Sequence, residues 1–226
     1  MAKLIPYPKF DTVSPEQVLK ASIWLFYGGN KVTEFFGNHV YKHPFWPAAF
    51  HAAGGLGGAE MLNIGIEATI KDVRKEYQET RRIDVIELLD LTDFERDIIC
   101  RKFRRDAGNN IYDAGGYARM GSKFWVLRFL KNIHASDKND FCSDNVVDNF
   151  SEPPLRRKGE ADEEYNSLLL PRKIEVSYLS SEDTAPWHLL EHAIDKNFQN
   201  GTRRIRTVHI GPDFLAAQKK KFPELT

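Results

Sequence analysis

The heptapeptide FCSDNVV, residues 141–147, is the stretch that says most about the fold of this chain. Val146, Val147 and Phe150 recur at helical spacing, so Cys142 is expected at or near the N-terminus of a helix. Backbone N–H groups and the helix dipole favour a thiolate at such a position. Cys142 is therefore the candidate nucleophile of a thiol-dependent site.

The other cysteine, Cys100, lies inside a predicted helix that opens with a capping box at Thr92 and Glu95 and runs to Gly108. Two cysteines are too few for a disulfide framework or a four-thiolate zinc site. Because its neighbours in that helix are large and apolar, Cys100 is expected to be a structural core residue. These neighbours are Ile98, Ile99 and Phe103.

A cysteine nucleophile needs a base, and the base needs a third polar group that orients it. Among the seven histidines, His51 is the candidate because it lies in an extended, small-residue segment ahead of the glycine-rich stretch 52–61. That stretch leads into an alternating strand predicted at 63–69, with Glu67 on its polar face. Glu67 is the candidate orienting carboxylate.

Whether His51 meets Glu67 depends on where the intervening hairpin turns. Directly opposite residues of an antiparallel hairpin are equidistant from its centre, so a turn centred on Ala59 sets His51 opposite Glu67. A turn centred on Leu56 sets His51 near Met61 instead and removes the carboxylate. The sequence leaves both registers open.

Other constellations carry weaker signals. His134, eight residues before the candidate nucleophile, is the runner-up base. His188 and His192 are four residues apart on a predicted helix, a spacing that can ligate zinc, but they lack the HExxH pattern and a third ligand. The glycines of GGLGG (54–58) lack the Lys-Ser/Thr of a phosphate-binding loop. No metal or other cofactor is expected.

The secondary-structure signals indicate an α+β fold, because strands and helices alternate without a regular βαβ rhythm. A charged, proline-containing stretch at 151–166 is expected to be an exposed loop and sets a soft boundary. We expect a core at 1–150 and a C-terminal extension at 151–226 packed on the same domain. Strands are predicted at 23–27, 63–69, 82–88, 173–179 and 204–210, and helices at 14–19, 92–108, from 142 onward and at 185–198.

Composition narrows the classes of function. The 226 residues, 42% of them hydrophobic, suffice for one core, and 32 Lys+Arg balance 32 Asp+Glu. A formal net charge of zero gives no general attraction to nucleic acid or anionic membranes. The first ten residues predict neither a signal peptide nor a transmembrane segment. We therefore expect a soluble protein, cytoplasmic as synthesised.

Four segments in order resemble one known arrangement: FHAA (50–53), IEA (66–68), NNIYD (109–113) and FCSDNVV (141–147). They are similar to the circularly permuted branch of the NlpC-type, papain-like cysteine peptidases and amidases, in which histidine precedes cysteine. The resemblance extends over about residues 22–150.

This resemblance implies a papain-like α+β fold in which a small antiparallel sheet packs against the nucleophile helix. It implies Cys142 as nucleophile, His51 as general base and Glu67 as orienting carboxylate. The family often has serine where this chain has Phe50, and glutamate where it has Asp144. These departures affect substrate contacts more than the triad, and the substrate-binding residues stay unknown.

The expected reaction is acyl transfer through a thioester, starting from a thiolate–imidazolium pair. The resemblance suggests peptide or amide bonds of the peptidoglycan type as substrates, with lipid acyl esters as the alternative. Aromatic residues near His51 suit either a groove or a core. A cell-wall enzyme without a signal sequence would need a phage particle, lysis or a dedicated export machine to reach its substrate. The aromatic residues are Tyr41, Phe45, Trp46 and Phe50.

The competing hypothesis is an inactive papain-like binding module that uses residues 151–226 as its interaction surface.

Overall fold

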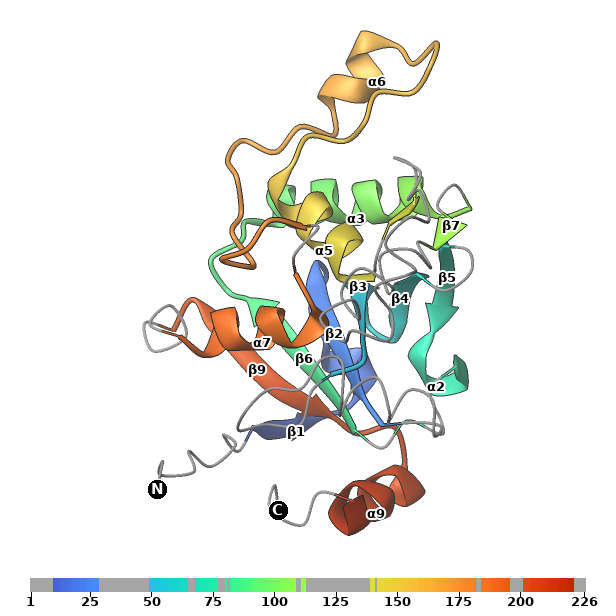
Figure 1. Ribbon diagram of the computed structural model, residues 1–226, viewed down its shortest axis with the longest axis vertical. Helices are drawn as coiled ribbons and strands as arrows, with labels where there is room; N and C mark the ends of the chain where they lie inside the picture. Colours follow the sequence, from blue (N-terminus) through green and yellow to red (C-terminus); the bar gives the residue numbers. More distant parts are fainter. Residues whose placement is uncertain are drawn as a thin grey trace, which may run out of the picture.

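The computed structural model shows a mixed α+β fold built on a seven-stranded sheet (Figure 1). It describes residues 10–28, 49–64, 68–76, 80, 82–108, 111–112, 139–140, 142–181, 184–195 and 201–221. The strand order is β1-β9-β6-β2-β3-β4-β5. The strands are β1 (Asp11–Val13), β2 (Ser22–Tyr27), β3 (His51–Gly57), β4 (Glu60–Ile64), β5 (Ala68–Asp72), β6 (Arg82–Leu88) and β9 (Arg203–Val208). The α+β class predicted from the sequence is confirmed.

Neighbouring strands of this sheet run antiparallel, except that β1 pairs parallel with β9. A separate parallel pair joins β7 (Ile111–Tyr112) to β8 (Asn139–Asp140). The predicted strands at 23–27 and 82–88 correspond to β2 and β6, and the strand predicted at 204–210 to β9.

Three helices cover one face of the sheet, which we call the helix face: α3 (Asp93–Asp106), α5 (Cys142–Ser151) and α7 (Pro186–Ile194). Phe214 of α9 (Pro212–Lys221) packs into the core of the opposite face. The other helices of the described part are α2 (Val73–Glu76), α6 (Asp162–Asn166) and the short 3-10 turn η1 (Pro15–Gln17). Within the described residues, no helix combines the length and the apolar character needed to cross a membrane.

Strand alternation divides the core into two clusters, one on each face. The helix-face cluster contains Ile23, Leu25 and Ala52 together with residues of α3 and α5. The opposite cluster contains Trp24, Phe26, Ala53 and Met61. In β3, therefore, even-numbered residues point toward the helices and odd-numbered residues point away.

Two glycines of β3 lie where another side chain presses against the strand. A Cβ on Gly54 would overlap the ring of Phe103 on the helix face, and one on Gly55 would overlap Ser22 and Trp24 on the other face. A shift of β3 by one residue would bring Ala53 or Leu56 into one of these contacts. The glycines thus fix the register of β3, and with it the face of every β3 side chain.

The prediction of one continuous strand at 63–69 is wrong. β4 ends at Ile64, β5 begins at Ala68, and these two residues pair with each other, so the chain reverses between them. The sequence pattern counted Gly65 as a strand residue, although glycine weakens strands and favours turns.

Two predictions in the C-terminal part are also corrected. Residues 173–177 form no strand, although Ile174 and Val176 are buried, because this extended segment lies over the end of α5 and not in the sheet. The helix predicted at 185–198 ends at Ile194, and its N-cap is Ala185.

Candidate functional site

Cys142 begins α5, as the sequence predicts, and is fully buried. Burial raises the pKa of its thiol to about 12, while the backbone N–H groups of Ala52, Ser143 and Cys142 itself act in the opposite direction. The negative charge of Asp144 adds to the increase. The thiol therefore lies at a helix N-terminus and against the amide of Ala52, but it is protonated at neutral pH.

His51 is the first residue of β3 and is 8% exposed. Its Nε2 lies 2.6 Å from Oδ1 of Asn63, and its ring packs beside Phe26, with 5.5 Å between the centroids. Burial lowers the pKa of His51 to about 4, and the hydrogen bond with Asn63 opposes this decrease. The imidazole is accordingly neutral at pH 7, with Nε2 donating to the amide oxygen.

Asn63 occupies the position for which the sequence predicted a carboxylate. It pairs with Ala53 across the β3–β4 hairpin, so it is a diagonal neighbour of His51 on the same face. An amide oxygen at this place holds the ring orientation of His51 as the third member of a cysteine site does. Sequence reasoning missed Asn63 because it considered only a charged partner. A two-residue turn at 58–59 without irregularity would pair Asn63 with Gly54, and the β-bulge between Gly55 and Gly57 shifts this pairing to Ala53.

The hairpin register lies between the two that the sequence left open. Gly54 pairs with Leu62, and the turn lies at 58–59, with left-handed backbone at Gly57 and Gly58. The register therefore does not centre on Ala59 or on Leu56. Glu67 lies outside the described residues.

β3 separates His51 from Cys142. His51 points to the face that holds Phe26 and Ala53, whereas Cys142 packs with Ala52 in the cluster of the helix face. The structure thus brings His51 to Asn63 and Cys142 to the backbone beside His51, but it leaves the two side chains on opposite faces of the sheet.

Buried polar contacts from α3 hold α5. Nζ of Lys102 donates to three carbonyl groups at the C-terminal end of α5, and Asp106 accepts from two side-chain amides of α5. A cation at a helix C-terminus satisfies orphan carbonyls and complements the helix dipole. The carbonyls are those of Asp148, Asn149 and Glu152, and the amides are those of Asn145 and Asn149.

The remaining candidates have structural surroundings. Cys100 is buried within α3, its Sγ lies 3.8 Å from the carbonyl oxygen of Gly55, and burial raises its pKa. Nδ1 of His188 accepts from the N–H of Ala185, and Nε2 of His192 lies 3.1 Å from the carbonyl oxygen of Glu175. Across the described ranges, no three His, Cys, Asp or Glu side chains are grouped so that they could hold a metal ion.

Several sequence candidates cannot be placed. His134 and three of the aromatic residues near His51 lie outside the described residues. The fourth, Phe50, is half-buried and stacks on the ring of His51, with 6.2 Å between the centroids. The aromatic residues outside the described part are Tyr41, Phe45 and Trp46.

In comparisons with known proteins, no family model, no curated protein and no solved structure matches this chain. The function is therefore inferred from the residues of the site.

Proposed function

We propose that the protein is a cysteine hydrolase of the papain-like, permuted NlpC type, seen in a resting form whose nucleophile and base are not yet joined. One observation carries the proposal: the Cys142 thiol, at the N-terminus of α5, lies against the amide of Ala52, which follows His51 in the chain. The ring of His51 in turn is oriented by Asn63. The proposed nucleophile, base and orienting residue thus all lie next to the first residues of β3, with the thiol on one face of the strand and the imidazole and Asn63 on the other.

Joining them requires a movement at the start of β3. The contacts of Gly54 and Gly55 fix the rest of the strand, so the change is confined to the residues before them. His51 is suited to such a change because its backbone is paired on one side only. It pairs with Phe26 of β2, whereas the pairing between β3 and β4 begins at Ala53. Rotation there, on substrate binding, carries the ring to the helix face and breaks its hydrogen bond with Asn63, so that Asn63 orients His51 in the resting form.

The reaction follows from the protonation states. Because burial keeps both the Cys142 thiol and the His51 imidazole neutral, His51 acts as a general base and not as half of a preformed ion pair. Sγ bonds to the carbonyl carbon of the substrate as its proton passes to the imidazole. The resulting oxyanion is held in part by the backbone N–H of Cys142.

The imidazolium then gives its proton to the leaving amine or alkoxide, and the thioester forms. Water attacks the thioester, His51 accepts its proton, and the acid is released as the thiol is restored. The substrate class that we propose is a peptide or amide bond, with peptidoglycan-type bonds as the first choice and acyl esters as the alternative.

A second candidate is a papain-like binding module without catalysis. The observation that favours it is the placement of His51 and Cys142 on opposite faces, with the thiol fully buried. In this hypothesis the pair contributes to the core, and no movement at β3 joins them.

Hydrolysis assays on peptide amides and acyl esters distinguish the cysteine hydrolase from the binding module. Mass spectrometry of the protein detects an acyl adduct. We expect Cys142→Ser to lose about three powers of ten or more in rate, the size typical of a catalytic nucleophile. Cys100→Ser is the matched control and should keep the native rate, while Asn63→Ala should lose less than Cys142→Ser. If native protein and Cys142→Ser are equally inactive on every substrate and no adduct forms on Cys142, the binding module is the better account.

A further inference from the structure

The residue after the nucleophile is tied to a segment far along the chain. Ser143, the second residue of α5, is fully buried, and its Oγ donates to the carbonyl oxygen of Thr184. Its backbone N–H is one of the groups that act on the Cys142 thiol. Ser143 thus links the nucleophile directly to the C-terminal part of the molecule.

The acceptor residue, Thr184, is itself held by hydrogen bonds to the residues that precede it. Oγ1 of Thr184 donates to the carbonyl oxygen of Ser180 (2.7 Å) and lies 2.9 Å from Oγ of Ser177. The backbone N–H of Thr184 donates to the carbonyl oxygen of Ser181 (3.0 Å). Thr184 is fully buried, so its carbonyl is a fixed acceptor.

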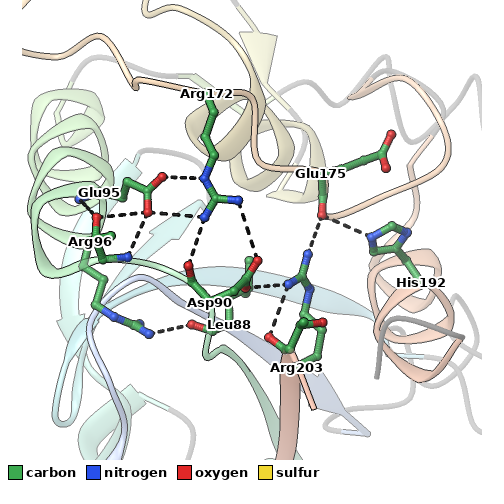
Figure 2. A network of polar contacts seen from close by, with 10 residues as sticks. Leu88, Asp90, Glu95, Arg96, Arg172, Glu175, His192 and Arg203 are labelled. Carbon is green, nitrogen blue, oxygen red and sulfur yellow. Dashed lines mark hydrogen bonds and ion pairs between the residues drawn. The ribbon is translucent and has the colours of Figure 1, made fainter. Parts of the chain in front are cut away.

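The segment that leads to Thr184 is fastened to the body of the protein, as Figure 2 shows. Arg172 reaches from the segment to Glu95 at the start of α3 (2.6 Å) and to the backbone of Asp90 (3.0 Å). The carbonyl oxygen of Glu175 accepts from Arg203 of β9 (3.0 Å) and lies near His192 of α7. Residues 172–181 and Thr184, which we call the 172–184 strap after its first and last residues, therefore link α3, β9 and the first turn of α5.

We propose that Ser143 is a positioning residue for Cys142 and that the 172–184 strap is part of the catalytic unit. The strap keeps the first turn of α5 buried and aligned, and it acts on the reaction through Cys142. This inference rests on the proposed function, but the reactivity of the thiol tests it separately.

The test compares Ser143→Ala with Ser151→Ala. Ser151 is a matched control because it is a serine of the same helix whose Oγ donates to the backbone of Val147 at the other end. Each protein is treated with iodoacetamide near neutral pH, and alkylation of Cys142 is followed by mass spectrometry with Cys100 as internal standard. Hydrolysis of the best substrate found for the native protein is measured in parallel.

We expect Ser143→Ala to raise the alkylation rate of Cys142 about tenfold and to lower kcat about tenfold, the effect of losing one buried hydrogen bond. KM should stay within about twofold, and Cys100 should react as in the native protein. Ser151→Ala should match the native protein in all of these readouts. A general loss of structure would instead expose Cys100 and Cys142 together.

Equal behaviour of the two alanine variants would overturn the proposal. If Ser143→Ala does not fold, Ser143→Thr replaces it in the test. This variant keeps the hydroxyl, so Cys142 should be alkylated at the native rate. A faster alkylation of Cys142 in Ser143→Thr would count against the strap. If no hydrolysis is found in any variant but Ser143→Ala still exposes Cys142 selectively, the strap holds and the proposed function fails.

Discussion

At the scale of single residues, burial determines the chemistry of the site. Cys142 and His51 are each shifted toward the neutral form because the surroundings of both are closed to water. A thiolate–imidazolium pair, as the sequence suggested, would need the two groups to touch, and β3 lies between them. In the proposed function, the two neutral groups on opposite faces represent the resting state, and a local movement at the start of β3 activates it.

The depressed pKa of His51 makes stability depend on pH. Between pH 6.5 and about 4 the unfolded chain binds a proton at this residue and the folded protein does not, so the free energy of unfolding decreases as pH falls through this window. The full difference is about 3 kcal/mol at most, and it is absent above pH 6.5.

Urea unfolding of the native protein and of His51→Gln at about pH 7 and at about pH 4.5 measures this contribution. The native protein should lose more stability between the two conditions than the variant does. Parallel losses in the two proteins would show that His51 is accessible to protons in the folded state.

At the scale of elements, the β3–β4 hairpin and α5 hold the site through steric fit. Phe103 of α3 occupies the space that a side chain on Gly54 would fill. This contact fixes the register of β3, and the register places His51 and Asn63 on the same face. The glycine-rich stretch combines two features: a turn at 58–59, and a close approach of other side chains to Gly54 and Gly55.

Gly54→Ala should destabilise the protein, because its new methyl group overlaps the Phe103 ring and overpacking typically costs about 1–3 kcal/mol. Phe103→Leu should create room for that methyl group. Denaturant unfolding of both single variants and the double variant measures the coupling, and we expect the double variant to be more stable than the sum of the two effects predicts. Strict additivity would mean that Phe103 does not restrain this strand.

The sequence predicted local features better than pairings. The capping box at Thr92, the helix start at Cys142 and the strands β2 and β6 follow from residues close together in the chain, and all are confirmed. The hairpin register depends on Phe103 and Trp24, which are distant in sequence from the glycines they touch. The partner of His51 could therefore not be read from periodicity alone.

At the scale of the whole molecule, the C-terminal residues complete the fold. β9 lies between β1 and β6 and hydrogen-bonds to both, so the sheet is continuous only when the chain after residue 150 is present (Figure 1). The buried carboxylate of Glu87 in β6 holds this junction, because it pairs with Arg204 (2.6 Å) and with Arg206 of β9. Loss of β9 would remove both arginine partners of Glu87, and removing one partner of an ion pair that is held out of water is costly.

We therefore expect a chain truncated after residue 150 to lack a cooperative unfolding transition. The truncation exposes the edges of β1 and β6 and removes the arginine partners of the Glu87 carboxylate. A chain truncated after residue 211 is the matched comparison, since it keeps β9 and removes α9 with Phe214, and it should unfold cooperatively with reduced stability. Circular dichroism during thermal unfolding measures both. A stable, cooperative 1–150 fragment would show that β6 can end the sheet, and the 172–184 strap would then be an addition to an independent core.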